Sequence, residues 1–230
     1  MLKAIIFDFN GIILNDEPLH FSSMRDAVAA VGIEISKQEY WERYLPFDDE
    51  ACLDAICRHH SRRLDAAERE ATLARKTRDY ENLLRDRLPL FPGAADLIRE
   101  AARNYPLALA SGARRREILA TLKAAGLQTC FRVIVAAEDF TLGKPHPESF
   151  LLALDRLNDS LGAEDGRLLP AECLVIEDSV GGVAGARTAG MRCLAVTNTY
   201  SREKLLEANR VVDSLETVTP DLLASLFEER

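Results

Sequence analysis

The sequence predicts an α/β fold, in which a parallel sheet carries a helical insertion. Two observations lead to this prediction. Short apolar segments alternate with helical segments over most of the chain, which is typical of a parallel sheet covered on both faces. One region, from residue 16 to 86, breaks this alternation and shows no convincing strand.

The expected strands are short and apolar. The first, residues 3–9 with the sequence KAIIFDF, is continuous and contains β-branched residues, as a strand buried on both faces does. Four later segments follow the same pattern, at 106–111, 132–137, 173–178 and 192–196.

Helices are expected between these strands, at 93–104, 114–125, 147–158 and 180–189. Gly126 and Gly190 follow two of the helical segments, at the place where a glycine commonly ends a helix. Pro147 begins a third, in the first turn, where proline is well tolerated.

The region 16–86 is expected to form the helical insertion and to rejoin the sheet near residues 90–93. Ser36 and Glu39 have the spacing of a capping box, and Asp65 and Glu68 repeat that spacing. We therefore predict a sheet domain, residues 1–15 and 87–230, and a helical domain, residues 16–86.

Composition excludes several classes of partner. The net charge of -8 argues against nonspecific binding of nucleic acid, because bulk phosphate would not be neutralised. The five cysteines include no CxxC pair and are odd in number, which favours a reducing, cytoplasmic interior. The sequence has neither a signal peptide nor an apolar window long enough for a membrane span, so no membrane partner is expected.

Polar groups occur at or just beyond the ends of four expected strands. Because parallel strands end at one edge of a sheet, these groups are expected to share a site. They are Asp8, Asn10, Ser111, Lys144, Glu177 and Asp178.

Phosphoryl transfer is the chemistry that such a set supports. A carboxylate nucleophile such as Asp8 divides one difficult step into two. Mg²⁺ prefers oxygen ligands, and Asp178 together with Asp8 suits it, with Glu177 as a further ligand or as the holder of a bound water. Lys144 would supply positive charge for the phosphate.

The phosphate itself is expected to meet hydrogen-bond donors. Ser111 can donate its hydroxyl, and the N–H groups of Gly112 and Ala113 can point at phosphate oxygens where the next helix begins. Each feature alone has an ordinary alternative, such as a helix cap or a solvated loop lysine. Their common order and their apolar flanks favour the shared site.

Four motifs resemble those of the haloacid dehalogenase superfamily: DFNGI, LASG, GKPHPESF and VIEDSVGGVAGARTAGM. The segment NDEPLHF and the helical insertion resemble its subgroup with a helical cap, which contains β-phosphoglucomutase and many small-metabolite phosphatases. The resemblance covers most of the chain and implies a Rossmann-like sheet core with an inserted cap domain.

The resemblance also implies a role for each matching residue. Asp8 would be the nucleophile and a metal ligand, and Asn10 a ligand through its backbone carbonyl. Ser111 and Lys144 would bind phosphate. The acidic pair would hold Mg²⁺ through Asp178, with Glu177 beside it.

Asn10 departs from the family pattern. Phosphatases and mutases of the family have an Asp here, which protonates the leaving alcohol and then deprotonates the attacking water. An amide can donate and accept hydrogen bonds but does not titrate. Loss of general acid–base catalysis costs roughly 10²–10⁴ in rate, and most for alkyl phosphates, whose alkoxide leaves badly.

Several interpretations of Asn10 stay open. The enzyme can be weak, or act on acyl or enol phosphates, which have good leaving groups. His20, two residues after Pro18, can supply the proton instead, or simply hydrogen-bond the linker. The remaining histidines, His59, His60 and His146, are expected at the surface.

Three further interpretations complete the set. A phosphonatase-type enzyme would form a Schiff base on a cap lysine, but Lys37 and Lys76 are both expected in polar, solvated surroundings. The Asn can be a laboratory replacement of Asp. The chain can also be a phosphometabolite-binding protein without turnover.

We therefore expect a Mg²⁺-dependent phosphohydrolase of small phosphorylated metabolites, with a sugar-phosphate mutase as the nearest alternative. A mutase needs a cap that recognises a sugar, and the segment 43–51 with Arg43 is the candidate. A monomer or small homo-oligomer is expected.

Overall fold

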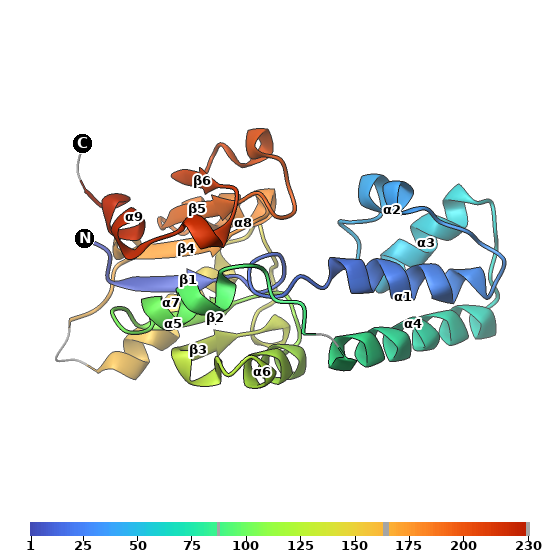
Figure 1. Cartoon of the computed structure of the whole chain (residues 1–230), viewed down its shortest axis with the longest axis horizontal. Helices are drawn as coiled ribbons and strands as arrows, with labels where there is room; N and C mark the ends of the chain where they lie inside the picture. The colour runs from blue at the N-terminus through green and yellow to red at the C-terminus, as the bar shows by residue number, and fades with distance from the viewer. Residues whose placement is uncertain (87, 163–165, 229–230) are drawn as a thin grey trace. The chain divides into compact units, whose positions relative to one another are not determined.

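The computed structural model describes residues 1–86, 88–162 and 166–228. The chain divides into two compact units. The sheet unit comprises residues 1–15 and 90–230, and the helical unit residues 16–89 (Figure 1). The predicted boundary between residues 86 and 87 differs by three residues, and residue 87 lies outside the described residues.

The sheet unit contains a parallel sheet with the strand order β3-β2-β1-β4-β5-β6. The strands are β1 (Ala4–Phe7), β2 (Leu107–Ala110), β3 (Phe131–Val135), β4 (Cys173–Glu177), β5 (Arg192–Val196) and β6 (Arg210–Val212). The predicted α/β fold with a parallel sheet is confirmed. The sequence did not predict β6, because three residues are too short a run to carry a strand pattern.

Helices surround this sheet (Figure 1). They are α5 (Ala94–Ala101), α6 (Arg115–Ala124), α7 (Glu148–Leu161), α8 (Val180–Thr188) and α9 (Pro220–Ser225). Gly126 and Gly190, with φ of 64° and 76°, follow α6 and α8 in the left-handed conformation. Both glycines thus end their helices as predicted.

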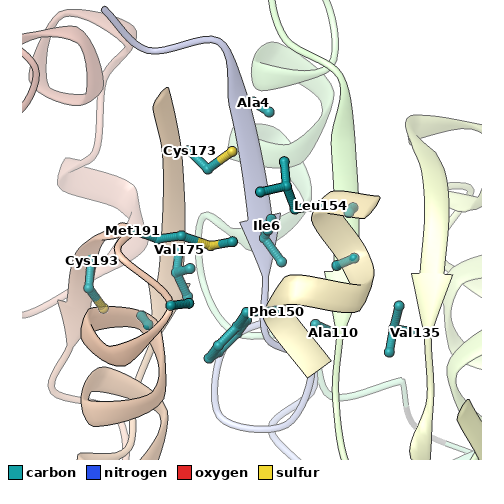
Figure 2. Close-up of a cluster of buried hydrophobic side chains, with 14 of the residues drawn as sticks. Ala4, Ile6, Ala110, Val135, Phe150, Leu154, Cys173, Val175, Met191 and Cys193 are labelled. Atoms are coloured by element: carbon teal, nitrogen blue, oxygen red, sulfur yellow. The ribbon is translucent and has the colours of Figure 1, made fainter. Parts of the chain in front are cut away.

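One face of the sheet packs against α7 and α8. Phe150 of α7 is fully buried in this cluster, beside Ile6 of β1, Ala110 of β2 and Val175 of β4 (Figure 2). Ile5 of β1 points to the opposite face, since side chains alternate along a strand, and it is also fully buried. Burial of both faces explains why the strands read as continuous apolar runs.

In the described residues of the helical unit, the elements are α1 (Glu17–Ala29), α2 (Lys37–Arg43), α3 (Asp49–His59) and α4 (Ala66–Asp86). Its core combines aliphatic side chains with an aromatic group, in which Phe21 lies 5.4 Å from Tyr40 and 5.5 Å from Trp41 between ring centroids. No strand occurs among these residues, as the sequence predicts. The described residues of the whole chain include no helix with the length and apolar character of a membrane span.

The two capping-box patterns differ in the structure. Asp65 and Glu68 form the complete box, each side chain accepting the other residue's N–H, at 2.8 and 3.0 Å. Ser36 accepts the N–H of Glu39 at 3.1 Å. The carboxylate of Glu39, however, is bonded to Tyr44 and His60.

Replacement of Phe150 tests the packing of the sheet face. Phe150→Ala should lower the free energy of unfolding by about 3–5 kcal/mol, because it removes a fully buried ring and leaves a cavity. Leu151→Ala, on the same helix but 41% exposed, should lower it by far less. Urea denaturation of both variants measures the difference, and equal losses would contradict the described packing.

Candidate active site

Asp8 follows β1 at the centre of the sheet edge. Phe7, the last residue of β1, pairs with Leu109 of β2 and with Ile176 of β4. Asp8 therefore lies between the ends of two neighbouring strands, and it is only 7% exposed. The sheet register, rather than any local feature, brings residues distant in sequence to this position.

Lys144 is the cation at this edge. Its Nζ lies 2.5 Å from Asp8 Oδ1 and 2.6 Å from Glu177 Oε1, and 4.9 Å from the centre of the Phe150 ring. Burial acts to lower the pKa of Lys144, but the two carboxylates outweigh it and raise the pKa above its ordinary value. Lys144 is therefore an ammonium held between two acids.

Glu177 is fully buried and its carboxylate is saturated with hydrogen bonds. Its Oε2 accepts the N–H of Asp178 at 2.8 Å, and both the N–H and the hydroxyl of Ser179, at 2.8 and 2.9 Å. Burial acts to raise the pKa of Glu177, but Lys144 and these donors lower it overall. In this structure, Glu177 mainly holds the Lys144 ammonium in position.

Asp178 is buried beneath the turn that follows β1. Gly11 in that turn has a φ of 79°, and a Cβ there would lie 1.9 Å from Asp178 Oδ2. Only glycine fits, because it tolerates this φ and leaves room for the carboxylate. The turn and the acid therefore occupy one tightly packed place.

Two residues of this site were not predicted from the sequence, Asn198 and Thr199. Asn198 Nδ2 donates to the carbonyl of Gly11 at 2.6 Å and so fixes the turn. The hydroxyl of Thr199 hydrogen-bonds Asp178. Both follow β5, and their polar segment TNT at the end of an expected strand was the signal that could have found them.

The acids outnumber the cation. Burial raises the pKa of Asp8 to about 7, with the nearby charge of Lys144 acting in the opposite direction. Burial, Glu177 and Asp8 raise the pKa of Asp178 well above its ordinary value. Three carboxylates share one ammonium, so when all are ionised the group lacks two positive charges, which a divalent cation would supply.

The donor set fits Mg²⁺. Oxygen atoms of Asp8, Glu177 and Asp178 all lie within 4.8 Å of one another. Mg²⁺ takes oxygen ligands and commonly one or two carboxylates. Since Glu177 is engaged by Lys144 and by three donors, Asp8 and Asp178 are the better candidates for direct ligands.

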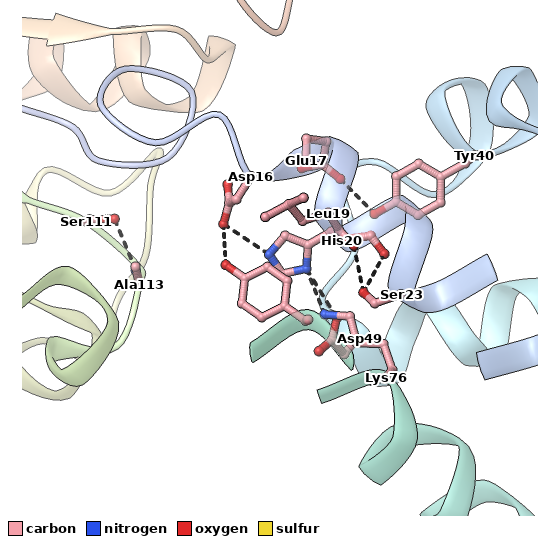
Figure 3. A network of polar contacts seen from close by, with 11 residues as sticks. Asp16, Glu17, Leu19, His20, Ser23, Tyr40, Asp49, Lys76, Ser111 and Ala113 are labelled. Atoms are coloured by element: carbon pink, nitrogen blue, oxygen red, sulfur yellow. Dashed lines mark hydrogen bonds and ion pairs between the residues drawn. The ribbon is translucent and has the colours of Figure 1, made fainter. Parts of the chain in front are cut away.

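One of the expected phosphate donors has a hydrogen-bond partner within the protein. Ser111 follows β2 at the same sheet edge and is 2% exposed. The N–H of Ala113, predicted to point at phosphate, instead donates to Ser111 Oγ at 3.1 Å (Figure 3). The hydroxyl forms a local turn with this amide, as serine hydroxyls often do. The backbone N–H of Gly112 stays a candidate donor to phosphate.

Asn10 belongs to the same turn as Gly11. It forms an isolated bridge with Leu14, and the N–H of Gly11 donates to the Leu14 carbonyl at 3.0 Å. The position is therefore held by backbone contacts, which do not depend on whether the side chain is an acid or an amide.

His20 lies on α1 in the helical unit, within a network of charged groups (Figure 3). Its Nε2 is 3.3 Å from Asp16 Oδ2, and its Nδ1 is 2.7 Å from Lys76 Nζ and 3.8 Å from Asp49 Oδ1. Burial acts to lower its pKa, but hydrogen bonds to Asp16 and Asp49 raise it to about 9.

Lys76 contradicts the expected solvated position, since it is only 2% exposed. Its Nζ forms an ion pair with Asp49 at 2.5 Å and lies 4.9 Å from the centre of the Tyr80 ring. The pattern of neighbouring arginines concealed a buried lysine, because its partners come from other helices. Arg43, at the end of α2, is exposed.

Comparison with known proteins identifies a matching family and several similar proteins. A family model described as haloacid dehalogenase-like hydrolase matches residues 2–190. The protein SUPPRESSOR OF QUENCHING 1 of Arabidopsis thaliana is 32% identical over 90% of this chain, which spans 19% of that protein. A phosphorylated carbohydrates phosphatase of Thermotoga maritima is 28% identical, with 99% of each chain covered.

Solved structures are similar over nearly the whole chain. A β-phosphoglucomutase of Clostridium difficile has a TM-score of 0.77 and 25% identity, covering 99% of this chain and 97% of that one. An Asp-to-Asn mutant of CbbY from Rhodobacter sphaeroides, in complex with xylulose-1,5-bisphosphate, has a TM-score of 0.76 and 28% identity, covering 94% and 96%.

The raised pKa of Asp8 makes stability depend on pH and on the metal. Its protonated form stabilises the fold fully below pH 3.8, and this contribution is lost as pH rises through about 7. Without divalent cation, the unfolding free energy should fall across this range, by up to about 1.4 kcal/mol per pH unit. Added Mg²⁺ should reduce the fall.

Urea denaturation from pH 5 to 8, in EDTA and in Mg²⁺, measures this effect. Asp8→Asn should reduce the pH dependence, to which Asp178 also contributes, whereas Asp96→Asn, whose side chain is 92% exposed, should leave it unchanged. A wild-type curve identical to that of Asp8→Asn, or indifferent to Mg²⁺, would contradict the assignment.

Proposed function

Since the chain belongs to the haloacid dehalogenase-like hydrolases and is an enzyme of the phosphatase type, we propose that it is a Mg²⁺-dependent phosphohydrolase of small phosphorylated sugars. The observation that carries the proposal is the buried Asp8, in contact with the Lys144 ammonium at 2.5 Å beside two further acids. Such a site attracts cations and, through them, a phosphate group.

Asp8 would be the nucleophile. Its carboxylate oxygen would bond to phosphorus while the bond from phosphorus to the sugar oxygen breaks, leaving a phosphoaspartate and a sugar alkoxide that needs a proton. Lys144 has three N–H donors, of which two are directed at Asp8 and Glu177. The third is available for an oxygen of the transferring phosphoryl group.

The second half-reaction would release Asp8. A water oxygen would bond to phosphorus, the bond from phosphorus to Asp8 would break, and the proton of the water would pass to an oxygen of the released phosphate or to solvent. Mg²⁺ bound at Asp8 and Asp178 would supply positive charge for both half-reactions. Ser111 would orient the phosphate through its buried hydroxyl.

Asn10 would weaken both proton transfers. Its amide can hydrogen-bond the leaving oxygen or the attacking water but cannot give up or take a proton in the working range. We expect alkyl phosphates to phosphorylate Asp8 slowly and acyl phosphates to do so much faster. Because water attack also lacks its base, the phosphoaspartate should be long-lived.

His20 is the candidate for the missing proton donor. Its pKa is raised to about 9, which favours an imidazolium that can act as an acid, but Nδ1 gains its proton only when the contact with the Lys76 ammonium, 2.7 Å away, opens. Its contacts with Asp16 and Asp49 hold the ring in place. A Schiff base on Lys76 fits less well, because this lysine is engaged as an ammonium with Asp49.

The substrate class follows from the relatives. The Thermotoga maritima protein is named for phosphorylated carbohydrates, and the CbbY complex contains a sugar bisphosphate. That complex contains an Asp-to-Asn mutant, so sugar phosphate binding and an amide in place of an acid are compatible in this fold. A binding protein with little turnover is therefore the alternative from a different class.

A sugar-phosphate mutase is the second candidate activity. The similarity to β-phosphoglucomutase supports it, and so does a slow water step, because the phosphoaspartate must outlast the exchange of the sugar.

The proposed substrates are cytoplasmic metabolites, and the five cysteines without disulfides agree with that compartment.

Replacing Asn10 by Asp should restore the proton transfer. Asn10→Asp should raise the rate at which a hexose phosphate phosphorylates Asp8 by about 10²–10⁴, and the rate with acetyl phosphate much less, because only the hexose leaves as an alkoxide. Rapid-quench measurement of the phosphorylation step in Mg²⁺ gives both rates, and the conversion between hexose phosphate isomers is followed alongside. Asn10→Ser serves as a non-titrating control of similar polarity. An equal gain in the phosphorylation step for both substrates would contradict the role of this position in protonating the leaving group.

His20→Gln tests the alternative proton donor. If His20 protonates the leaving oxygen, the variant should lose hexose phosphate hydrolysis while keeping that of acetyl phosphate, which needs no such acid. His146→Gln, in the other unit, should behave as wild type. Loss of both activities in His20→Gln would point to a structural role for the charged network.

A further inference from the structure

A second cluster of possible metal ligands lies in the helical unit. Glu39 comes from α2, His59 is the last residue of α3, and His60 follows it. The sequence predicts no more than a surface position for these two histidines. In the structure one ligand atom from each of the three residues lies within 4.8 Å of the others.

The three side chains converge on one carboxylate oxygen. Glu39 Oε1 lies 2.8 Å from His60 Nε2 and 3.7 Å from His59 Nε2. The histidine rings stand nearly perpendicular, with an interplanar angle of 88° and centroids 5.1 Å apart. The edge of one ring therefore meets the face of the other, and both Nε2 atoms still lie within 3.7 Å of Glu39 Oε1.

We propose that Glu39, His59 and His60 bind one first-row transition metal ion, for which Zn²⁺ is the representative. Two imidazoles and a carboxylate are the ligand set that Zn²⁺ takes when it keeps an open position. Mg²⁺ prefers oxygen alone, so this cluster and the acids at the sheet edge would select different ions.

The sequence of α2 supports a task for Glu39 beyond helix capping. In the box formed by Asp65 and Glu68, the glutamate returns to cap the helix, at 3.0 Å. Glu39 holds the equivalent place after Ser36, yet its carboxylate is directed to the histidines. The same local pattern therefore has two outcomes in one chain.

The surroundings favour an anionic ligand and a bound cation. Buried Tyr44 donates its hydroxyl to Glu39 Oε1 at 2.6 Å, which holds the carboxylate in place as outer hydrogen bonds do at metal sites. The carboxyl end of α3 adds partial negative charge beside both histidines.

The ligands are also open to ions from solution. The side chains of Glu39, His60 and His59 are 18%, 27% and 42% exposed. Because the ligands come from α2 and from the end of α3, a bound ion would link these two helices. Binding would therefore raise the melting temperature as ion concentration increases, as for any ligand of the folded state.

Calorimetric titration of the full chain with Zn²⁺, in excess Mg²⁺ to occupy the sheet-edge acids, tests the proposal. Wild type should bind one Zn²⁺ that the double variant His59→Gln/His60→Gln does not bind. Titration with Co²⁺, followed by its visible absorption, should give the same stoichiometry. His146→Gln, which removes a surface histidine near Glu148, should bind like wild type.

Tyr44→Phe provides a graded readout, because it removes the hydroxyl that holds Glu39 and should weaken Zn²⁺ binding by about 10-fold. Circular dichroism of each variant without Zn²⁺ establishes that the helices are formed. The proposal is overturned if wild type binds no Zn²⁺ in excess Mg²⁺, or if the folded double variant binds it with wild-type affinity and stoichiometry.

Discussion

The ammonium of Lys144, held between Asp8 and Glu177, is the interaction on which the sheet-edge site depends. It brings together carboxylates from the residue after β1 and from the end of β4, and burial makes each of them costly without a positive partner. Lys144 alone cannot balance them. The remaining negative charge is what makes the site a receptor for a divalent cation and, with that cation, for a phosphate.

Glycine and backbone contacts give this charge cluster its shape. Gly11 leaves room for the Asp178 carboxylate, and a Cβ on Gly182 would lie 1.8 Å from Glu177 Oε1. Asn198 fixes the Gly11 carbonyl from the end of β5. The carboxylates therefore have little freedom to move apart. Their mutual repulsion is kept at the place where a cation would bind.

The fold and most of this cluster could be predicted from the sequence for a physical reason. Parallel strands are continuous apolar runs, and their ends share an edge, so the order of the residues alone was enough to bring Asp8 and Asp178 together. Contacts that depend on tertiary packing could not be read in this way. Burial of Lys76, the turn between Ser111 and Ala113, and the redirected Glu39 all arise from partners on other elements or in local turns.

The helical unit shows how far composition can mislead. Its helices are rich in charge, yet Lys76 and Asp16 are buried and hydrogen-bonded within it. Polar surroundings in sequence therefore do not imply solvent in space, because a helix turns neighbouring residues to different faces.

The most direct measurement of the central claim is mass spectrometry of the protein mixed with acetyl phosphate and Mg²⁺ and quenched in acid. Because Asn10 leaves water attack without its base, one phosphoryl group should accumulate on the peptide that contains Asp8, and Asp8→Asn should carry none. Turnover of acetyl phosphate that proceeds without phosphorylated Asp8, or that survives in Asp8→Asn, would contradict it.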